Sequence, residues 1–174
     1  MKVLKFGGSS VGSPEAIRRM VDIVLGSPGA VLVVSAFSGV TDAIIAVARM
    51  AATAPAAERK TAWIGAYDEL ASRHHLALSE LSGGPRADEA GVALESLLLE
   101  FRELLSGVAL LRELSPRSLD LLMSFGERLS ATIVAAAFCE VGVQAVAVDA
   151  REIIIAEGNF GNARPLRGPT ERAI

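Results

Sequence analysis

The chain has 174 residues, of which 51% are apolar, so it is long and apolar enough for one domain with a real hydrophobic core. Its 17 basic and 20 acidic residues give a net charge of -3 without a long run of one sign, so the composition shows no electrostatic footprint for nucleic acid or an anionic membrane. The one cysteine, Cys139, excludes an internal disulfide and is expected to be a small buried residue in a reducing compartment.

The most apolar stretch, 129–148, is broken by Glu140, Gly142 and Gln144, so it predicts a buried helix followed by a strand and not a membrane span. An apolar run follows Met1 directly, which leaves no room for a signal or transit peptide. We therefore expect a cytoplasmic protein whose partners are small molecules or another subunit, with no nucleic acid and no membrane among them.

The first fifty residues alternate between strands and helices. A short apolar run at 3–6 ends in two glycines, and Ser13 then caps a helix that continues to Leu25. The next run, 31–34, is continuous and β-branched, which is typical of a strand buried on both faces of a parallel sheet. A loop at 35–41 leads into a second helix. Two such units predict a layered α/β fold with right-handed crossovers.

The middle of the chain, 54–114, predicts a helical excursion from the sheet, with helices at about 57–80 and 87–111. His74 and His75 lie in this excursion without a nearby cysteine or a second histidine cluster, so we interpret them as surface residues and not as metal ligands.

The last third of the chain returns to the sheet in this prediction. A long helix begins at Pro116 and ends before Gly142. A third strand at 143–148 and a fourth extended segment at 152–155 follow, and the glycine, asparagine and proline content of 157–165 predicts an irregular loop.

The loop after the first strand has the parts needed to hold a polyphosphate. Gly7 and Gly8 let backbone N–H groups approach oxygen atoms, the hydroxyl of Ser9 can donate, and Lys5 supplies a positive charge. The pattern is neither a Walker A loop nor GxGxxG. A tight strand-to-helix turn with a solvated lysine explains these residues equally well.

The loop 35–41 leaves the second strand and should lie at the same carboxyl edge of the sheet, where open parallel sheets bind ligands. Ser35, Thr41 and the following helix N-terminus could hold a substrate carboxylate. The alternative is that Thr41 or Asp42 simply caps the helix.

Glu127 follows a glycine inside an otherwise apolar helix, and a helix-interior glycine costs about 1 kcal/mol relative to alanine. Close approach of a ligand or of another part of the backbone would account for Gly126. Glu127 could then face the pocket and bind a substrate ammonium, but on the residues alone a solvated Glu127 paired with Arg128 or another surface charge is the simpler interpretation.

Three segments together resemble the aspartate kinase branch of the amino-acid kinase superfamily in order and spacing. They are KFGGSSV at 5–11, VSAFSGVT at 34–41 and SFGERLS at 124–130, and DAR at 149–151 and NFGNA at 159–163 extend the likeness over nearly the whole chain. The resemblance implies a three-layer α/β sandwich around a mainly parallel sheet. Residues 1–174 would form the amino-terminal part of one such domain, with the helical insertion at 54–114, and the carboxy-terminal nucleotide half and the regulatory domains would be absent.

The resemblance also implies roles for individual residues. Lys5 would contact the transferring phosphoryl group, and the remaining contacts would divide between the ATP phosphates (Gly7, Gly8, Ser9) and the aspartate (Ser35, Thr41, Glu127, Phe160). Ser9 stands where the family usually has threonine, and it retains the hydroxyl. Phe160 would lie on a loop over the substrate, whereas its simpler interpretation is a small cluster of apolar side chains under that loop.

The implied reaction transfers the γ-phosphate of ATP, bound with Mg²⁺, to the β-carboxylate of L-aspartate, the first step toward lysine, threonine and methionine. A carboxylate is already deprotonated at neutral pH, so no general base, resident metal or tightly bound cofactor is required. The long helical excursion resembles the lysine- or threonine-sensitive and the homoserine-dehydrogenase-fused types. A homo-oligomer is expected for the full-length enzyme.

Two alternatives remain at this point. The chain could belong to another amino-acid kinase, with glutamate, acetylglutamate or carbamate as the acceptor, or it could be a non-catalytic binding or assembly fragment. Because the family's kinase domain continues well beyond this length, we expect residues 1–174 alone to be inactive and to expose a strand edge and apolar helix faces.

Overall fold

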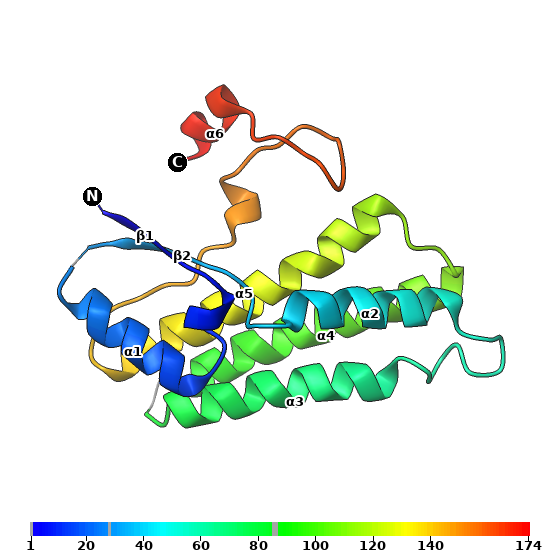
Figure 1. The fold of residues 1–174 in the computed structure, drawn as a ribbon, viewed down its shortest axis with the longest axis horizontal. Helices are drawn as coiled ribbons and strands as arrows, with labels where there is room; N and C mark the ends of the chain where they lie inside the picture. Colours follow the sequence, from blue (N-terminus) through cyan, green and yellow to red (C-terminus); the bar gives the residue numbers. More distant parts are fainter. Residues whose placement is uncertain (1, 28, 85–86) are drawn as a thin grey trace.

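The computed structural model describes residues 2–27, 29–84 and 87–174. Figure 1 shows two short strands beside a bundle of long helices, with a carboxy-terminal segment that rises away from the bundle. The elements in chain order are β1 (Val3–Phe6), η1 (Gly8–Ser10), α1 (Pro14–Leu25), β2 (Val31–Val34), α2 (Val40–Thr53), α3 (Ile64–Leu81), α4 (Ala87–Leu111), α5 (Pro116–Glu140), η2 (Ala150–Glu152) and α6 (Arg167–Ala173).

The two strands form a parallel pair in the described part of the chain, with α1 as the crossover between them, which confirms the predicted α/β organisation. In the register of this pair, Val3 lies beside Val31 and Lys5 beside Val33. These four residues share one face because side chains alternate along a strand. The valines of that face are 45–59% exposed, so the prediction that β2 is buried on both faces is wrong. Only the opposite face of the pair packs against the core.

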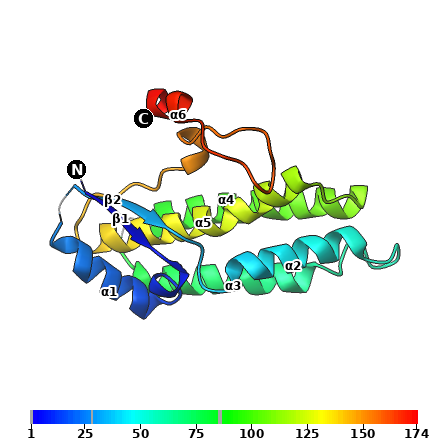
Figure 2. The same ribbon diagram turned by 45° about the horizontal axis from the view of Figure 1, so that its top comes forward.

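Helices α2, α3, α4 and α5 pack together in a bundle beside the strands, as Figure 2 shows from a second direction. Their shared core contains large, fully buried side chains, among them Phe101, Phe125, Leu98 and Leu129. The predicted helical excursion is confirmed, but its first helix begins at Ile64 and not near residue 57. Residues 55–63 instead form successive turns, in which backbone hydrogen bonds between residues three or four apart pair some of the polar groups locally.

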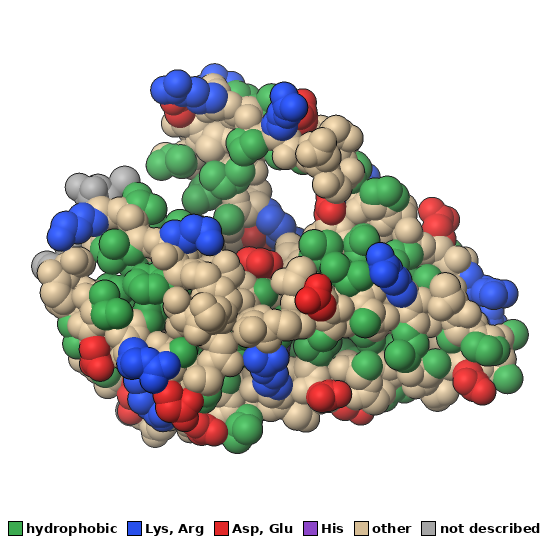
Figure 3. Space-filling model, in the orientation of Figure 1, with side chains coloured by type: hydrophobic (Ala, Val, Ile, Leu, Met, Phe, Trp, Pro, Cys, Tyr) green, Lys and Arg blue, Asp and Glu red, His purple; other side chains and the backbone are tan. Residues whose placement is uncertain are grey.

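Two further predictions about extended segments are wrong. Residues 143–148 are irregular and have no strand partner among the described residues, and Val146 is 83% exposed. A β-strand needs a hydrogen-bonded neighbour, which a sequence pattern cannot supply. Residues 152–155 form no strand either: Glu152 ends the short turn η2, which the side chain of Asp149 caps, and Ile154 and Ile155 have no regular structure. Figure 3 shows the carboxy-terminal segment arching over an opening beside the main body.

Helix α5 runs through the centre of the molecule. By length and composition it could cross a membrane, but 56% of its most apolar part is buried inside this structure, and core helices of soluble proteins can be equally long and apolar. Gly142, with a φ of 81°, ends the helix as predicted. Cys139 near its end is half-buried, and its thiol contacts the carbonyl oxygen of Ala145 at 3.5 Å.

Gly126 is the point of closest approach between α5 and the loop that follows β2. A Cβ atom built on Gly126 would lie 2.8 Å from the Cβ of Ala36, closer than real Cβ contacts, and 3.5 Å from side-chain atoms of Val40 and Ile44. The close approach that the sequence required for this glycine is therefore made by the loop and the start of α2.

His74 is fully buried, so its predicted place on the surface is wrong; His75 is exposed as expected. The Nδ1 of His74 lies 2.7 Å from the carbonyl oxygen of Leu70, and its ring stacks on Phe37 with centroids 5.0 Å apart. Its Nε2 has no hydrogen-bond partner in the described structure. Burial holds the pKa of His74 below its ordinary value of 6.5, although the bond to Leu70 opposes this shift.

We expect Gly126→Ala to destabilise the protein. Overpacking a core costs about 1–3 kcal/mol, which exceeds the gain of about 1 kcal/mol from replacing a helical glycine. Urea unfolding measures the change in the free energy of unfolding. Gly107→Ala in α4 is the control: a Cβ at Gly107 meets nothing within 4 Å, so this substitution should stabilise the protein. Adding Ala36→Gly should restore part of the loss. Equal stabilisation by both alanine variants would contradict the close contact.

We also expect the free energy of unfolding to fall as the pH drops below about 6.5. In that range the unfolded chain binds a proton at His74 while the folded chain keeps the buried ring neutral, so acid favours unfolding. Urea unfolding at several pH values measures this slope. His74→Phe keeps an aromatic ring beside Phe37 and should flatten the slope, whereas His75→Gln should leave it in place. An unchanged slope in His74→Phe would assign the acid sensitivity to other groups.

Candidate active site

The two predicted loops meet at the carboxyl edge of the parallel pair. The N–H of Ser35 donates to the carbonyl oxygen of Phe6 at 3.1 Å, which extends the strand pairing by one residue. A Cβ at Gly8 would lie 3.1 Å from the carbonyl oxygen of Ala36, so only a residue without a side chain fits easily between the loops. The first loop and the second loop, which we define as residues 7–12 and 35–41, are thus in direct contact.

The first loop turns tightly after β1. The N–H of Ser10 donates to the carbonyl oxygen of Gly7 at 2.9 Å, and the short turn η1 begins at Gly8. Lys5 and Ser9 are exposed, and neither side chain has a hydrogen bond or ion pair within the described residues. The end of β1 and the first loop therefore carry an exposed ammonium, an exposed hydroxyl and two glycines within five consecutive residues.

The second loop enters α2 through Gly39, whose φ of 78° lies in the left-handed region that favours glycine. No side chain caps this helix, so the alternative that Thr41 or Asp42 acts as its cap is wrong. Thr41 is half-buried in the first turn, and Ser35 is half-buried at the end of β2. In the sequence, Ser35 adjoins Ala36, where the two loops touch, and Thr41 follows five residues later. Neither hydroxyl caps the helix.

Glu127 reaches the second loop from α5. Its carboxylate oxygen accepts a hydrogen bond from the N–H of Ala36 at 3.3 Å, 91 residues earlier in the chain. Arg128 pairs with Glu100 at 2.8 Å and with Asp149 at 3.1 Å, so the predicted pairing of Glu127 with Arg128 is not found. Gly126 lets the helix come close enough for this bond, and the carboxylate remains exposed beside the loop.

A charged cluster holds the segment after α5 against the helix. Asp149 accepts bonds from Arg151 at 2.7 Å and from Arg128 at 3.1 Å. The bonded Arg151 and, to a smaller extent, Arg128 hold the pKa of the Asp149 carboxyl below its ordinary value, although partial burial opposes them. The same bond to Asp149 raises the pKa of Arg151. The segment therefore leaves α5 in a defined direction.

Phe160 lies near the amino-terminal end of α5. The guanidinium of Arg117 stands 5.7 Å from the centre of its ring, and the N–H of Gly161 donates to Asp120 at 2.7 Å. With a rise of 1.5 Å per residue, Asp120 is roughly 10 Å along the helix from Glu127. Phe160 is 46% exposed, so the alternative of a small apolar cluster under this loop is wrong. The structure places the loop over α5 without joining Phe160 to the two loops.

Arg73 is a site residue that the sequence did not reveal. It lies on α3, in the predicted excursion, yet it donates to carbonyl oxygens of both loops, at Ser38 and at Gly12. An arginine on the polar face of a helix has no distinguishing sequence pattern, and its two acceptors are backbone atoms far away in the chain.

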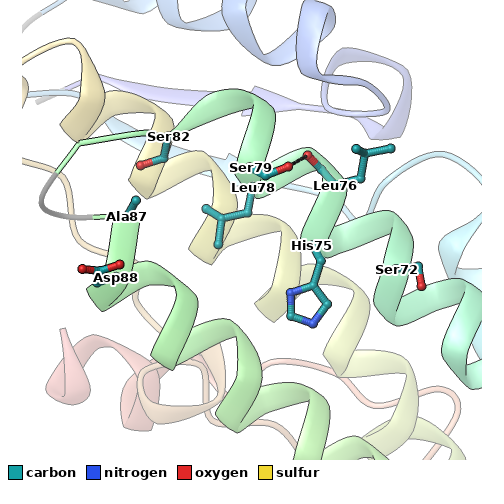
Figure 4. Close-up of a pocket in the computed structure, with 8 residues that line it drawn as sticks. All are labelled: Ser72, His75, Leu76, Leu78, Ser79, Ser82, Ala87 and Asp88. Carbon is teal, nitrogen blue, oxygen red and sulfur yellow. Dashed lines mark hydrogen bonds between the residues drawn. The ribbon is translucent and has the colours of Figure 1, made fainter.

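A cavity of about 630 Å³ lies elsewhere, between α3 and α4. Figure 4 shows the residues that line it, which include His75, Ser79 and Asp88 and none of the predicted site residues. Among the described residues there is also no group of three or more histidine, cysteine, aspartate or glutamate side chains that could hold a metal ion.

Comparison with known proteins gives relatives that share this region. The chain is 33% identical over 163 residues to chloroplastic aspartokinase 1 of Arabidopsis thaliana, which covers 92% of this chain and 27% of the relative. It is 30% identical over 164 residues to the lysine-sensitive aspartokinase 3 of Escherichia coli strain K12, and this match covers 94% of this chain and 34% of the relative. The chain thus spans between about a quarter and a third of the length of these relatives.

Solved structures agree with these relatives. E. coli aspartokinase III in complex with lysine and aspartate superposes with a TM-score of 0.84 at 28% identity, over 99% of this chain and 36% of that one. The same enzyme in complex with aspartate and ADP gives a TM-score of 0.83 at 29% identity. The model of the amino acid kinase family matches residues 1–173, so the chain belongs to the amino acid kinase family.

Proposed function

We propose that this chain forms the amino-terminal part of an aspartate kinase, which transfers the γ-phosphate of ATP to the β-carboxylate of L-aspartate. The observation that carries the proposal is the bond between Glu127 and the N–H of Ala36, because it brings a carboxylate to the loop that adjoins the glycine-rich first loop. A carboxylate, hydroxyls and an ammonium on neighbouring loops match the charges of an amino acid and of a polyphosphate.

In the proposed reaction an oxygen of the aspartate β-carboxylate attacks the γ-phosphorus of ATP. A carboxylate–phosphorus bond forms, the bond from that phosphorus to the β–γ bridging oxygen breaks, and ADP leaves with the electron pair. The acceptor is ionised at neutral pH, so catalysis consists of positioning the reactants and neutralising charge. Mg²⁺ enters with ATP as part of the substrate.

Each predicted residue has a role in this scheme. Lys5 offsets charge on the transferring phosphoryl group, Gly7, Gly8 and Ser9 contact the ATP phosphates, Ser35 and Thr41 contact the aspartate, Glu127 binds its ammonium, and Phe160 covers the substrate. The exposed position of Lys5 near the end of β1 supports these assignments, as do the half-buried hydroxyls of Ser35 and Thr41, which make no hydrogen bond among the described residues.

The relatives support finer proposals. One of them is named lysine-sensitive, and others are fused to homoserine dehydrogenase, so a place in lysine and threonine biosynthesis fits this chain. We also propose a cytoplasmic enzyme that forms a homo-oligomer. Since the chain spans only between about a quarter and a third of the length of these relatives, the activity is proposed for the protein at its full natural length.

A coupled assay of ADP formation by that protein tests the function. With ATP and Mg²⁺, we expect turnover with L-aspartate and little or none with glutamate, acetylglutamate or carbamate. Turnover with one of the other acceptors would assign the chain to a different amino-acid kinase, and ATP-dependent turnover with none of them would reject a kinase function.

We expect Lys5→Ala to lower kcat far more than it changes the KM for aspartate, because Lys5 acts on charge that develops in the transition state. Losing such an electrostatic contact costs on the order of a hundredfold in kcat. Lys2→Ala is the matched control, since Lys2 flanks the same strand and its ammonium lies 3.4 Å from the hydroxyl of Ser27. Near-normal turnover by Lys5→Ala would show that Lys5 is a solvated side chain at the turn without a role in phosphoryl transfer.

We expect Glu127→Gln to act mainly on aspartate binding. A bond to a charged group contributes about 1.5–3 kcal/mol, so weakening it should raise the aspartate KM by roughly tenfold or more while the KM for ATP changes little. Steady-state kinetics measure both constants, with the exposed Glu103→Gln in α4 as the control. An unchanged aspartate KM in Glu127→Gln would leave Glu127 with only its structural bond to Ala36.

A further inference from the structure

Arg73 is the point at which the helical layer holds both loops. Its guanidinium donates one hydrogen bond to the carbonyl oxygen of Ser38 in the second loop at 3.0 Å. It donates another to the carbonyl oxygen of Gly12, at the end of the first loop, at 3.3 Å. The two bonds use different nitrogen atoms of one rigid, planar group, so they fix the distance between the two carbonyl groups.

The second loop is also held by its aromatic side chain. Phe37 is only 2% exposed, and the guanidinium carbon of Arg73 lies 5.9 Å from the centre of its ring. The neighbouring His74 stacks on the same ring, with an angle of 14° between the planes. Helix α3 therefore contacts the second loop in two ways: through a hydrogen bond to the carbonyl group of Ser38 and through the buried ring of Phe37.

The loops touch one another beside this arginine. A Cβ at Gly12 would lie 2.9 Å from the carbonyl oxygen of Gly8 and 3.2 Å from the Cβ of Ser38. Gly12, Phe37 and Arg73 also line a small cavity of about 110 Å³ on the α3 side of the loops. Any change in the separation of the loops must therefore be accommodated at Arg73.

We propose that Arg73 is a positioning residue of this site: it holds the first and second loops at the separation that phosphoryl transfer requires. This inference rests on the proposed function, in which the first loop holds the phosphates and the second holds the acceptor. Arg73 touches neither reactant and acts through the backbone of both loops. The inserted helices thereby contribute directly to the site, although they lie outside the sheet.

Two variants and one control test the proposal in the protein at its full natural length. Arg73→Met removes the guanidinium, and Arg73→Lys keeps a positive charge but cannot span both carbonyl groups. Arg102→Met is the control, because Arg102 also lies over a buried ring, that of Tyr67 at 5.8 Å, on a different helix. The measurements are amide hydrogen exchange and the kcat and KM values for both substrates.

Hydrogen exchange reports the loops independently of any activity. In Arg73→Met, we expect the amides of Val40 and Ser10, which close the turns of the two loops, to exchange about three- to tenfold faster than in the wild type, as for the loss of one or two exposed hydrogen bonds. The amides in α4 should keep their wild-type rate. A general loss of stability would instead accelerate all of these amides together. Arg102→Met should leave the loop amides at the wild-type rate.

Kinetics report the consequence for the reaction. We expect Arg73→Met to lower kcat by about tenfold with little change in either KM, because misplaced reactants lose transition-state alignment before they lose affinity. Arg73→Lys should fold like the wild type and still retain most of this defect. Wild-type exchange at Val40 and Ser10 together with wild-type kcat in Arg73→Met would overturn the proposal. If the wild-type protein shows no turnover with aspartate, the proposed function fails, and the exchange data still decide whether Arg73 holds the loops.

Discussion

The site depends on the contact between Gly126 in α5 and Ala36 in the second loop. The absence of a side chain at Gly126 allows the loop to lie against the helix, since a Cβ there would come within 2.8 Å of Ala36. Only at this separation does Glu127 reach the N–H of Ala36. The loop position in turn sets where Ser35 and Thr41 lie relative to the first loop. The arrangement of both loops at the carboxyl edge of the strand pair therefore requires a residue without a side chain at position 126.

The parts that could be predicted from the sequence are those encoded by neighbouring residues. Glycine after an apolar run at Gly7 and Gly8 predicts a turn, Ser13 before Pro14 predicts a helix start, and the structure has both. The predicted close approach at Gly126 also follows from a local cost, that of glycine inside a helix. The three motifs, taken in order, then identified the family, because each lies at a turn or helix position where few residue types fit.

The parts that could not be predicted depend on distant partners. Residues 143–148 have the composition of a strand, yet pairing is decided by a neighbour that the pattern does not specify. His74 has a polar side chain, but its place is decided by Phe37, which offers a ring for stacking. Arg73 bonds only to backbone carbonyl groups, and Glu127 has its structural partner 91 residues away. Periodicity predicts which face of a helix is apolar and not which polar residue crosses to another element.

The sheet alone is too small to hold the loops. Each strand of the described pair has four residues, and one face of the pair is largely exposed, so the strands fix where each loop begins but not where it ends. Beyond the strands, the second loop is held by side chains of opposite charge from two helices: Glu127 of α5 holds it at Ala36, and Arg73 of α3 holds it at Ser38. Since α3 and α5 pack against each other through the helical core, a change in that core alters the distance between these two anchors. The stability of the helical layer and the geometry of the site are therefore linked, which explains why a segment outside the sheet matters to chemistry at its edge.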